Sequence, residues 1–275
     1  MCRWFHPHQR FRNTMPGFAE GEKIVLRSSK GNCILIEIQS GSRKIPGLGV
    51  IDTLQMLGDA DFGDVMRFGT REFTILEPRL PELVSSMRRN AQTISAKDAG
   101  FIIAKLGIGA DDVVVEAGLG SGGLTMHMLR VLGPDGKLIS VENRQKHADT
   151  GLVNVENAIG AWGSKIDYQC IIGDVAEVDA KIPDNVDAMI FDLPDHSSAI
   201  TALAGKLKSG GRIACYCPVS SQLEEAWKSA ESAGLEIDWA GELMQREWGR
   251  ASKGGMRPIN GPFGHTAFLL IALKT

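Results

Sequence analysis

A glycine-rich turn and three acidic residues stand at the ends of four successive apolar segments of the sequence. These residues are, in chain order, Gly118, Gly120, Gly122, Glu142, Asp174 and Asp192. Glycines let the backbone pass close to a ligand, and the amide groups of a helix that follows them face that ligand. Carboxylates can accept hydrogen bonds from hydroxyl and amino groups. The pattern therefore predicts a nucleotide-like ligand, and the alternative is a tight strand-to-helix turn without one.

Two cofactor classes fit the glycine turn and Glu142, because an acidic residue after the second strand holds a ribose in both. The later strand ends separate the classes. Asp174 can accept a hydrogen bond from an adenine amino group, and Asp192 stands beside the expected reacting centre. A dinucleotide dehydrogenase has no need of both aspartates. Taken singly, each aspartate is equally expected as a turn or helix N-cap residue. Taken together, the four strand ends favour S-adenosylmethionine as the cofactor.

The elements that position these residues follow from hydrophobic periodicity. We expect strands at residues 113–116, 137–142, 166–172, 188–192, 212–217, about 237–243 and 266–273, with helices between most of them. No clear helix separates the last two strands, so we expect that pair to be antiparallel. The predicted fold class is α/β: a Rossmann-like, seven-stranded sheet with helices on both faces.

The chain divides into four expected segments by pattern. They are a disordered N-terminus at 1–17, a small β-rich domain at 18–77, a linker at 78–93 and the large α/β domain at 94–275. In the small domain, short apolar runs such as KIVLRS, CILIEI and EFTILEP alternate with turn residues. In the linker, Pro78 and Pro81 interrupt regular pairing before a short helix.

Composition limits the class of protein. The chain has 275 residues, a formal net charge of −3 and five cysteines without a C-x-x-C pair, so neither a disulfide framework nor a zinc ribbon is indicated. No run approaches the about 18 apolar residues of a membrane span. The net charge argues against a uniformly basic nucleic-acid binder but leaves room for a local basic face. We expect a cytoplasmic protein with no metal site and no membrane association.

Several segments carry a resemblance to a known family. They are FAEGEKIVL, ILEPRLPELVSSMRRNAQTISAKDAG, EAGLGSGGLT, FDLP and GHTAFLLIALK. With these segments the chain resembles the tRNA 1-methyladenosine methyltransferases of the archaeal and bacterial homotetrameric type. The resemblance implies a class I methyltransferase sheet, S-adenosylmethionine as cofactor and a homotetramer. It also implies tRNA as the partner, methylated on ring nitrogen 1 of a T-loop adenine at position 58 or its neighbour.

The resemblance also assigns roles to individual residues. Leu119 to Gly122 would line the methionine part of the cofactor, Glu142 would hold the ribose, and Asp174 would bind the adenine. Asp192 would touch both the cofactor and the target adenine. The complete cofactor set is Ile94, Glu116, Gly118, Leu119, Gly120, Ser121, Gly122, Glu142, His147, Asp174, Val175 and Asp192.

Asp192 is also the predicted catalytic residue on chemical grounds. Alkylation of ring nitrogen 1 leaves a cation on the adenine, and a fixed carboxylate stabilises that charge as it develops. The same carboxylate can accept a hydrogen bond from the exocyclic amine and so orient the ring nitrogen. No strong base is required, because the ring nitrogen already carries a free lone pair near neutral pH.

A T-loop adenine must leave its stack to reach such a pocket, and the RNA needs a basic track. The candidates for that track are Arg88, Arg89, Arg246, Trp248, Arg250, Lys253 and Arg257. The alternative for the last five is a solvated loop between the final two strands. Gly254 and Gly255 would give such a loop flexibility.

Three departures from the family pattern fall on the substrate side. Ser95 stands where relatives commonly carry a tyrosine, His196 and Ser197 replace a Pro-Trp pair, and RKIPGLGVIDTLQMLG has no histidine. Two alternatives therefore stay open. One is a divergent class I methyltransferase that acts on another RNA base or on a protein carboxylate. The other is a non-catalytic RNA-binding paralogue.

Overall fold

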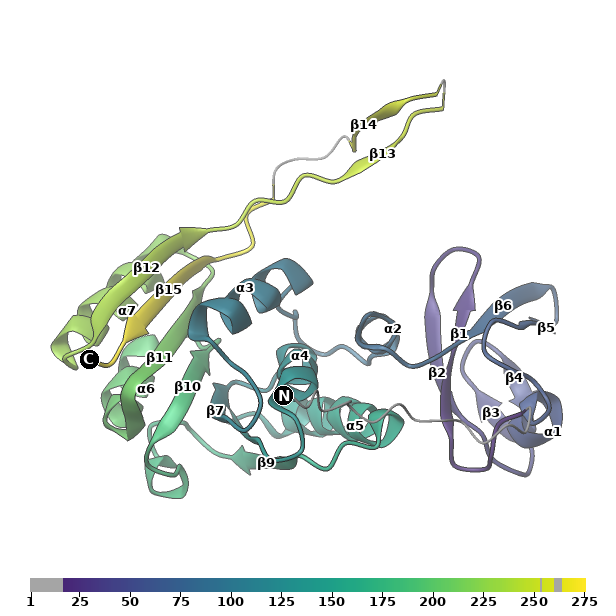
Figure 1. Ribbon diagram of the computed structural model, residues 1–275, viewed down its shortest axis with the longest axis horizontal. Coiled ribbons are helices and arrows are strands. Elements are labelled where there is room, and N and C mark those ends of the chain that lie inside the picture. Colours follow the sequence, from purple (N-terminus) through teal and green to yellow (C-terminus); the bar gives the residue numbers. More distant parts are fainter. Residues whose placement is uncertain (1–16, 253, 260–263) are drawn as a thin grey trace, which may run out of the picture. The chain divides into compact units, whose positions relative to one another are not determined.

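The computed structural model describes residues 17–252, 254–259 and 264–275. These residues form two compact units, one ending at Ser86 and the other running from Met87 to Thr275 (Figure 1). The disorder expected for residues 1–17 falls, apart from Gly17, outside the described residues. None of the described helices is both long and apolar enough to cross a bilayer.

The first unit is built on an antiparallel sheet of order β2-β1-β6-β5. Its elements are β1 (Lys23–Ser28), β2 (Cys33–Glu37), β3 (Arg43–Ile45), β4 (Gly49–Ile51), α1 (Thr53–Leu57), β5 (Val65–Phe68), β6 (Arg71–Leu76) and α2 (Leu80–Ser86). Phe73 and Ile75 alternate into the same core as Ile24 and Leu26, which is the period of a half-buried strand. The three apolar runs read as strands are confirmed as β1, β2 and β6.

Two helices of this unit follow from local sequence. The helix α1 was not predicted; it begins after Asp52, whose carboxylate accepts a hydrogen bond from the Gln55 amide, as an N-cap residue does. The helix α2 has Pro81 as its second residue, where a missing amide hydrogen costs no helical hydrogen bond. A proline in the first turn therefore leaves this short helix intact.

The second unit contains a seven-stranded sheet of order β12-β15-β11-β10-β7-β8-β9. Its strands are β7 (Val113–Ala117), β8 (Lys137–Glu142), β9 (Asp167–Ile172), β10 (Val186–Phe191), β11 (Leu207–Cys217), β12 (Glu236–Glu242) and β15 (Phe268–Leu273). The strand β15 is antiparallel to both β11 and β12, whereas the pairs among β7 to β11 are parallel. The prediction of a seven-stranded α/β sheet with an antiparallel last pair is confirmed.

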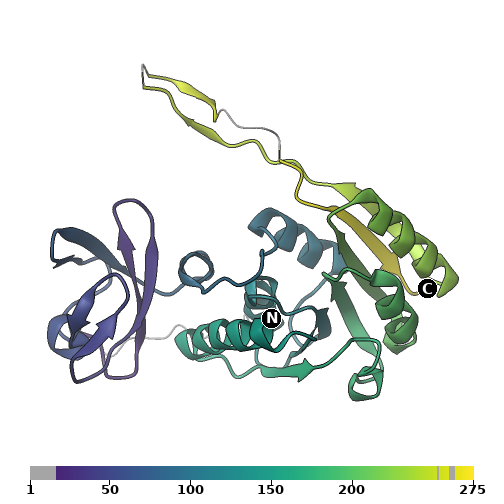
Figure 2. The same cartoon turned by 180° about the vertical axis from the view of Figure 1, so that it is seen from behind.

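Helices cover both faces of this sheet (Figures 1 and 2). They are α3 (Ala96–Leu106), α4 (Gly123–Leu132), α5 (Gln145–Trp162), α6 (His196–Leu203) and α7 (Ser220–Ser232), with short 3-10 turns at Asp179–Lys181 and Ala204–Lys206. Val114 packs into the core formed with α3, α4 and α5, and its neighbour Val115 packs into the core formed with α6 and α7. Burial on both faces explains why these parallel strands are almost wholly apolar.

Two segments differ from the expected pattern. The strand β11 begins at Leu207, which pairs with Val186, rather than near residue 212 as expected. The sequence did not predict this start, because the segment LKSGG shows no apolar period. The expected loop between the last two strands instead contains a hairpin of β13 (Trp248–Arg250) and β14 (Met256–Pro258). Gly254 and Gly255 have φ of +88° and +83° and so fit its turn, where an L-residue would be strained.

Candidate active site

The glycine-rich turn joins β7 to α4 at the carboxyl edge of the parallel strands. Gly120 and Gly122 have φ of +55° and +78°, a region that glycine enters without a steric penalty. A Cβ on Gly118 would lie 3.1 Å from Oε2 of Glu142, so a side chain there would crowd the carboxylate. The turn therefore requires glycine both for its backbone angles and for its approach to the next strand.

Glu142, the last residue of β8, is buried and its carboxylate is held from both sides. The Gly120 amide donates to Oε2 at 2.9 Å, and the Arg144 amide donates to Oε1 at 3.0 Å. The Arg144 guanidinium Nε lies 3.4 Å from the same Oε1. Hydrogen bonds to a charged carboxylate are among the stronger ones in proteins, so the turn and the strand end are fixed relative to each other.

A second set of contacts fastens residues 88–91 to the turn. The Ser121 hydroxyl accepts from the Asn90 and Ala91 amides, at 3.2 and 3.0 Å, and donates to the Ala91 carbonyl at 3.1 Å. Asn154 of α5 bonds the Arg88 amide and carbonyl, at 3.0 and 2.8 Å, and the Ser121 carbonyl at 2.9 Å. The Ser121 side chain is thus engaged with the chain's own backbone.

Two adjoining hollows open at this edge of the sheet. The first, about 340 Å³, is lined by Ala91, Gln92, Thr93, Ile94, Gly118, Gly120, Glu142, Arg144, Asp192, Leu193, Pro194, Tyr216, Pro218, Gln222 and Thr266. The second, about 710 Å³, is lined by Ala117, Gly118, Val141, Glu142, Asn143, Arg144, Gly173, Asp174, Val175, Ala176, Glu177, Asp192, Leu193, Pro194, Asp195 and Ser198. The residues common to both, which form the wall that the two hollows share, are Gly118, Glu142, Arg144, Asp192, Leu193 and Pro194.

Asp192 follows β10 directly and is fixed by its backbone. Its amide donates to the Ala117 carbonyl at 2.6 Å, and its carbonyl accepts from the Gly118 amide at 3.4 Å. Asp192 is exposed at the hollows, but partial burial of its carboxyl group raises the pKa to about 6; the Arg144 charge lowers the pKa and the Glu142 charge raises it. The carboxylate is therefore ionised at neutral pH but close to its titration range.

Glu116 lies beneath the glycine turn and is fully buried. Burial raises its pKa to about 8, against the lowering effect of hydrogen bonds from the Thr125 and Ser140 hydroxyls, at 2.7 and 2.8 Å. It lines a small third hollow together with Leu119 and Ser121. At neutral pH this carboxyl group is mostly protonated, unlike Asp192.

The structure brings most of the expected cofactor residues together. Ile94, Gly118, Gly120, Glu142 and Asp192 line the first hollow, Asp174 and Val175 line the second, and Glu116, Leu119 and Ser121 line the third. Gly122 and His147 are absent from the described lining of all three. Gly122 instead packs on α5, where a Cβ would lie 3.1 Å from the Gly151 carbonyl oxygen.

The expected RNA-contacting residues are exposed but dispersed. Arg88, Arg89, Arg246, Trp248, Arg250 and Arg257 all have exposed side chains, and Lys253 lies outside the described residues. In the β13–β14 hairpin Trp248 pairs with Pro258 and Arg250 with Met256, whereas Arg257 pairs with Gly249. Because side chains alternate along a strand, Trp248 and Arg250 share one face and Arg257 lies on the other.

Sequence reasoning missed Arg144, Tyr216 and Thr266, all of which line the first hollow. Tyr216 stands near the carboxyl end of β11. Ligands gather at such strand ends, so its position at the end of an apolar run was the signal that could have identified it. Ser95 is not in the described lining of the hollow; it is the N-cap residue of α3. Similarly, the His196 ring is buried against the Tyr216 carbonyl, 3.2 Å from Nε2, and burial lowers its pKa.

The sequence has clear relatives. The family model described as tRNA methyltransferase complex GCD14 subunit matches residues 73–253. The tRNA (adenine(57)-N(1)/adenine(58)-N(1))-methyltransferase TrmI of Methanocaldococcus jannaschii is 33% identical over 224 residues, covering 73% of this chain and 78% of the relative. The tRNA (adenine(58)-N(1))-methyltransferase TrmI of Thermus thermophilus is 27% identical over 251 residues, covering 91% and 96%.

Solved structures agree with the fold. A structure described as a SAM-dependent O-methyltransferase of Thermotoga maritima superposes with a TM-score of 0.76 at 25% identity, covering 97% of this chain and 98% of that one. A tRNA (m1A58) methyltransferase TrmI of Aquifex aeolicus superposes with a TM-score of 0.69 at 21% identity, covering 94% and 99%. Both likenesses extend over nearly the whole chain.

Proposed function

Because this chain belongs to the family of the tRNA methyltransferase complex GCD14 subunit, we propose that it is an S-adenosylmethionine-dependent tRNA methyltransferase. It forms 1-methyladenosine in the T-loop, at position 58 or its neighbour, as its relatives are named for positions 57 and 58. The methyl transfer is carried out by residues 94–275, and the acting protein is a cytoplasmic homotetramer, as the family resemblance implies.

The observation that carries the proposal is the position of Asp192. This carboxylate stands in the wall shared by two hollows, beside Glu142 and the glycine turn. A methyltransferase needs such an arrangement, because the methyl donor and the methyl acceptor must meet at one point. A protein that only binds RNA has no use for two carboxylates in the wall between two adjoining hollows.

The residues of the larger hollow fit the cofactor. Glu142, Asp174 and Val175 all line this hollow, and a Cβ at Gly118 would lie 3.1 Å from Oε2 of Glu142. S-adenosylmethionine, when bound, supplies an electrophilic methyl group on a sulfonium. In this proposal Glu142 accepts hydrogen bonds from the ribose hydroxyls and Asp174 accepts one from the adenine amine.

The smaller hollow, which Ile94, Gly118 and Gly120 also line, then takes the methionine end of the cofactor and, beside it, the methyl acceptor. Asp192, ionised at neutral pH, stabilises the positive charge that develops on the adenine ring and accepts a hydrogen bond from its exocyclic amine. Ile94 and Leu193 add apolar surface to the same space. Methyl transfer to a hydroxyl would in addition require a group that removes the hydroxyl proton. Ring nitrogen 1 of adenine requires no such group, because it carries a free lone pair and no proton.

The decisive experiment is nucleoside mass spectrometry of unmodified tRNA incubated with the protein and isotopically labelled S-adenosylmethionine. We expect label in 1-methyladenosine, and ribonuclease mapping should locate it in the T-loop. Label in a 2′-O-methylated nucleoside, or in a protein carboxylate when lysate protein is added, would identify a divergent methyltransferase. Asp192→Asn is the matched control and should leave the tRNA almost unlabelled.

A further inference from the structure

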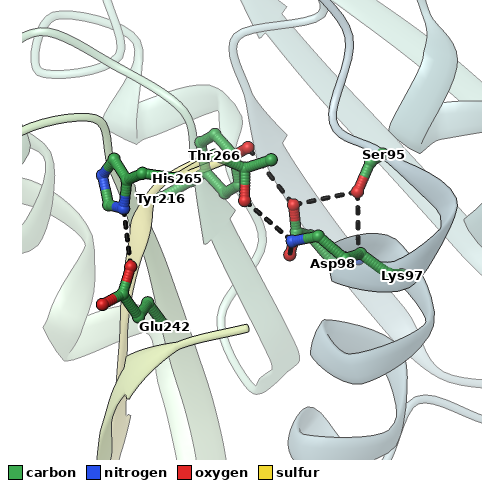
Figure 3. Close-up of polar contacts among 7 residues, drawn as sticks. All are labelled: Ser95, Lys97, Asp98, Tyr216, Glu242, His265 and Thr266. Atoms are coloured by element: carbon green, nitrogen blue, oxygen red, sulfur yellow. Dashed lines mark hydrogen bonds and ion pairs between the residues drawn. The ribbon is translucent and has the colours of Figure 1, made fainter. Parts of the chain in front are cut away.

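A polar network centred on the buried Asp98 adjoins the smaller hollow. It consists of Ser95, Lys97, Asp98, Tyr216 and Thr266, and we call it the Asp98 network (Figure 3). The Lys97 ammonium donates to Oδ1 of Asp98 at 2.6 Å and to the Thr266 hydroxyl at 2.8 Å. The Ser95 and Tyr216 hydroxyls donate to Oδ2 of Asp98, at 2.9 and 3.4 Å. Both carboxylate oxygens are therefore satisfied.

The network joins three elements that are distant in the chain. Asp98 lies in the first turn of α3, Tyr216 lies on β11, 118 residues away, and Thr266 precedes β15, 169 residues from Lys97. An acidic residue in the first turn also suits the helix dipole. The network consequently fixes the start of α3 to the carboxyl end of β11 and to the entry of β15.

Stability alone does not account for a charge pair in this position. The Asp98 side chain is 1% exposed and the Lys97 side chain 17% exposed. Removing two charges from water costs several kcal/mol per ion, and apolar side chains of similar volume commonly replace such pairs without loss. What a fully bonded charge pair supplies, and an apolar pair does not, is a directed hold on particular hydroxyl groups.

Two of the three hydroxyl residues so held are in the wall of the smaller hollow. Tyr216 and Thr266 line it together with Asp192, whereas Lys97 and Asp98 do not belong to its described lining. We propose that Lys97 and Asp98 are positioning residues, which fix Tyr216 and Thr266 in the wall against which the methyl acceptor is placed. This inference rests on the proposed function.

Ser95 also belongs to the Asp98 network. Its hydroxyl accepts from the Asp98 amide at 3.4 Å and donates to the Asp98 carboxylate, so it caps α3 and belongs to the network. Tyr216 is the aromatic residue in the described lining of the hollow. With serine at position 95, the orientation of Tyr216 decides the shape of the aromatic wall, and the Asp98 carboxylate sets that orientation.

A double-mutant cycle tests the proposal. Asp98→Asn, Tyr216→Phe and the double variant are compared with the wild type in single-turnover methylation of tRNA, and S-adenosylhomocysteine binding is measured by calorimetry. We expect Asp98→Asn to lower kcat/KM for tRNA by about tenfold while cofactor affinity stays within about twofold. In the Tyr216→Phe background the same change should cost less than about threefold, because residues that act through one another are not additive.

The control is Asp167→Asn, which breaks the exposed Lys137–Asp167 ion pair at the amino edge of the sheet and should leave kcat/KM unchanged. Should Asp98→Asn not fold, Lys97→Met, which removes the donor to both Asp98 and Thr266, serves in its place with the same expected pattern. Additive losses, or equal losses in tRNA turnover and cofactor affinity, would assign the network to folding alone. A wild type that fails to methylate tRNA would instead overturn the proposed function itself.

Discussion

Gly120 and Glu142 are joined by a hydrogen bond of 2.9 Å from the main-chain amide of the first to Oε2 of the second. The bond connects the glycine turn after β7 to the end of β8, its parallel neighbour. Glu142 is buried, and its other oxygen is bonded to Arg144. The acidic strand end and the turn thus take up their relative positions through the protein's own contacts, which lowers the entropic cost of ligand binding.

We expect cofactor binding to depend on this carboxylate. In the proposed site Glu142→Ala removes the acceptor of the ribose hydroxyls, and it also removes the acceptor of the Gly120 amide. Calorimetry should therefore show S-adenosylmethionine affinity weakened by about 1.5 to 3 kcal/mol. Glu156→Gln, on the exposed face of α5, is the control and should bind like the wild type. Unchanged affinity in Glu142→Ala, or tight binding of NADH by the wild type, would contradict the cofactor assignment.

The pH dependence of methyl transfer should report the ionisation of Asp192. Burial raises the pKa of this carboxyl to about 6, and only the ionised form stabilises a developing cation. The single-turnover rate with saturating tRNA should therefore rise with pH through about 6 and level off above about 7. Asp192→Asn should lower the plateau by about 10² to 10³ and remove this rise.

Calorimetry on the same variant supplies the binding control, because asparagine keeps the size of aspartate and one acceptor oxygen. We expect Asp192→Asn to retain most of the cofactor affinity. A loss of rate below about threefold would mean that Asp192 acts only as a strand-end residue. Asp195, which caps α6, would then be the next carboxylate to test.

The two faces of the β13–β14 hairpin should contribute unequally to tRNA binding. Trp248 and Arg250 share a face, and an aromatic ring beside a cation suits both base stacking and phosphate contact. Arg250→Ala should reduce the slope of log affinity against log salt by about one, and Trp248→Ala should weaken binding at every salt concentration. Filter binding over a sodium chloride series measures both effects, with Arg257→Ala as the comparison on the other face. If the slope of log affinity against log salt is the same in all variants and in the wild type, the hairpin is a solvated segment that does not contact tRNA.

Glu116 should make the protein less stable as the pH rises. Its pKa is about 8 in the folded chain and close to 4.5 in the unfolded chain, so between these values unfolding releases a proton. The free energy of unfolding therefore falls with pH through this range, by up to about 1.4 kcal/mol per unit. The glutamine side chain in Glu116→Gln is neutral at every pH in this range, and its carbonyl oxygen can accept hydrogen bonds from the same two hydroxyl groups, those of Thr125 and Ser140.

Urea unfolding at several pH values between about 5 and 9 tests this expectation. The stability of Glu116→Gln relative to the wild type should increase with pH up to about 8 and then stay constant. The exposed Glu156→Gln should show no such trend. A pH-independent difference between Glu116→Gln and the wild type would mean that Glu116 is ionised in the folded protein.

Local patterns were sufficient to predict the sheet and one side of the site. Gly118, Glu142 and Asp192 stand directly after apolar runs, and parallel strands bring such ends to one edge whatever the rest of the chain does. The strands β7 to β10 were found to within two residues, since burial on both faces makes them continuously apolar.

The other side of the site depends on contacts that no local pattern encodes. Thr266 reaches the smaller hollow because β15 inserts beside β11, and Tyr216 is hydrogen-bonded there to Asp98, 118 residues earlier in the chain. The β13–β14 hairpin was read as a loop because Arg, Ser, Lys and Gly dominate its sequence. Its strands of three residues each are too short to show a period.

The position of β15 has a consequence for biosynthesis. This strand is the last of the seven in chain order, yet it lies between β11 and β12, and β12 has no other strand partner in the sheet. A ribosome-bound chain that has not yet released Phe268–Leu273 must therefore leave the backbone hydrogen-bonding groups of β12 open to water. The edge of β11 that pairs with β15 also lacks its strand partner until then. Unpaired strand edges are sites at which nascent chains aggregate. Translation speed over the segment that encodes β12 to β15 should consequently affect the yield of folded protein more than speed over the segment that encodes β7 to β10.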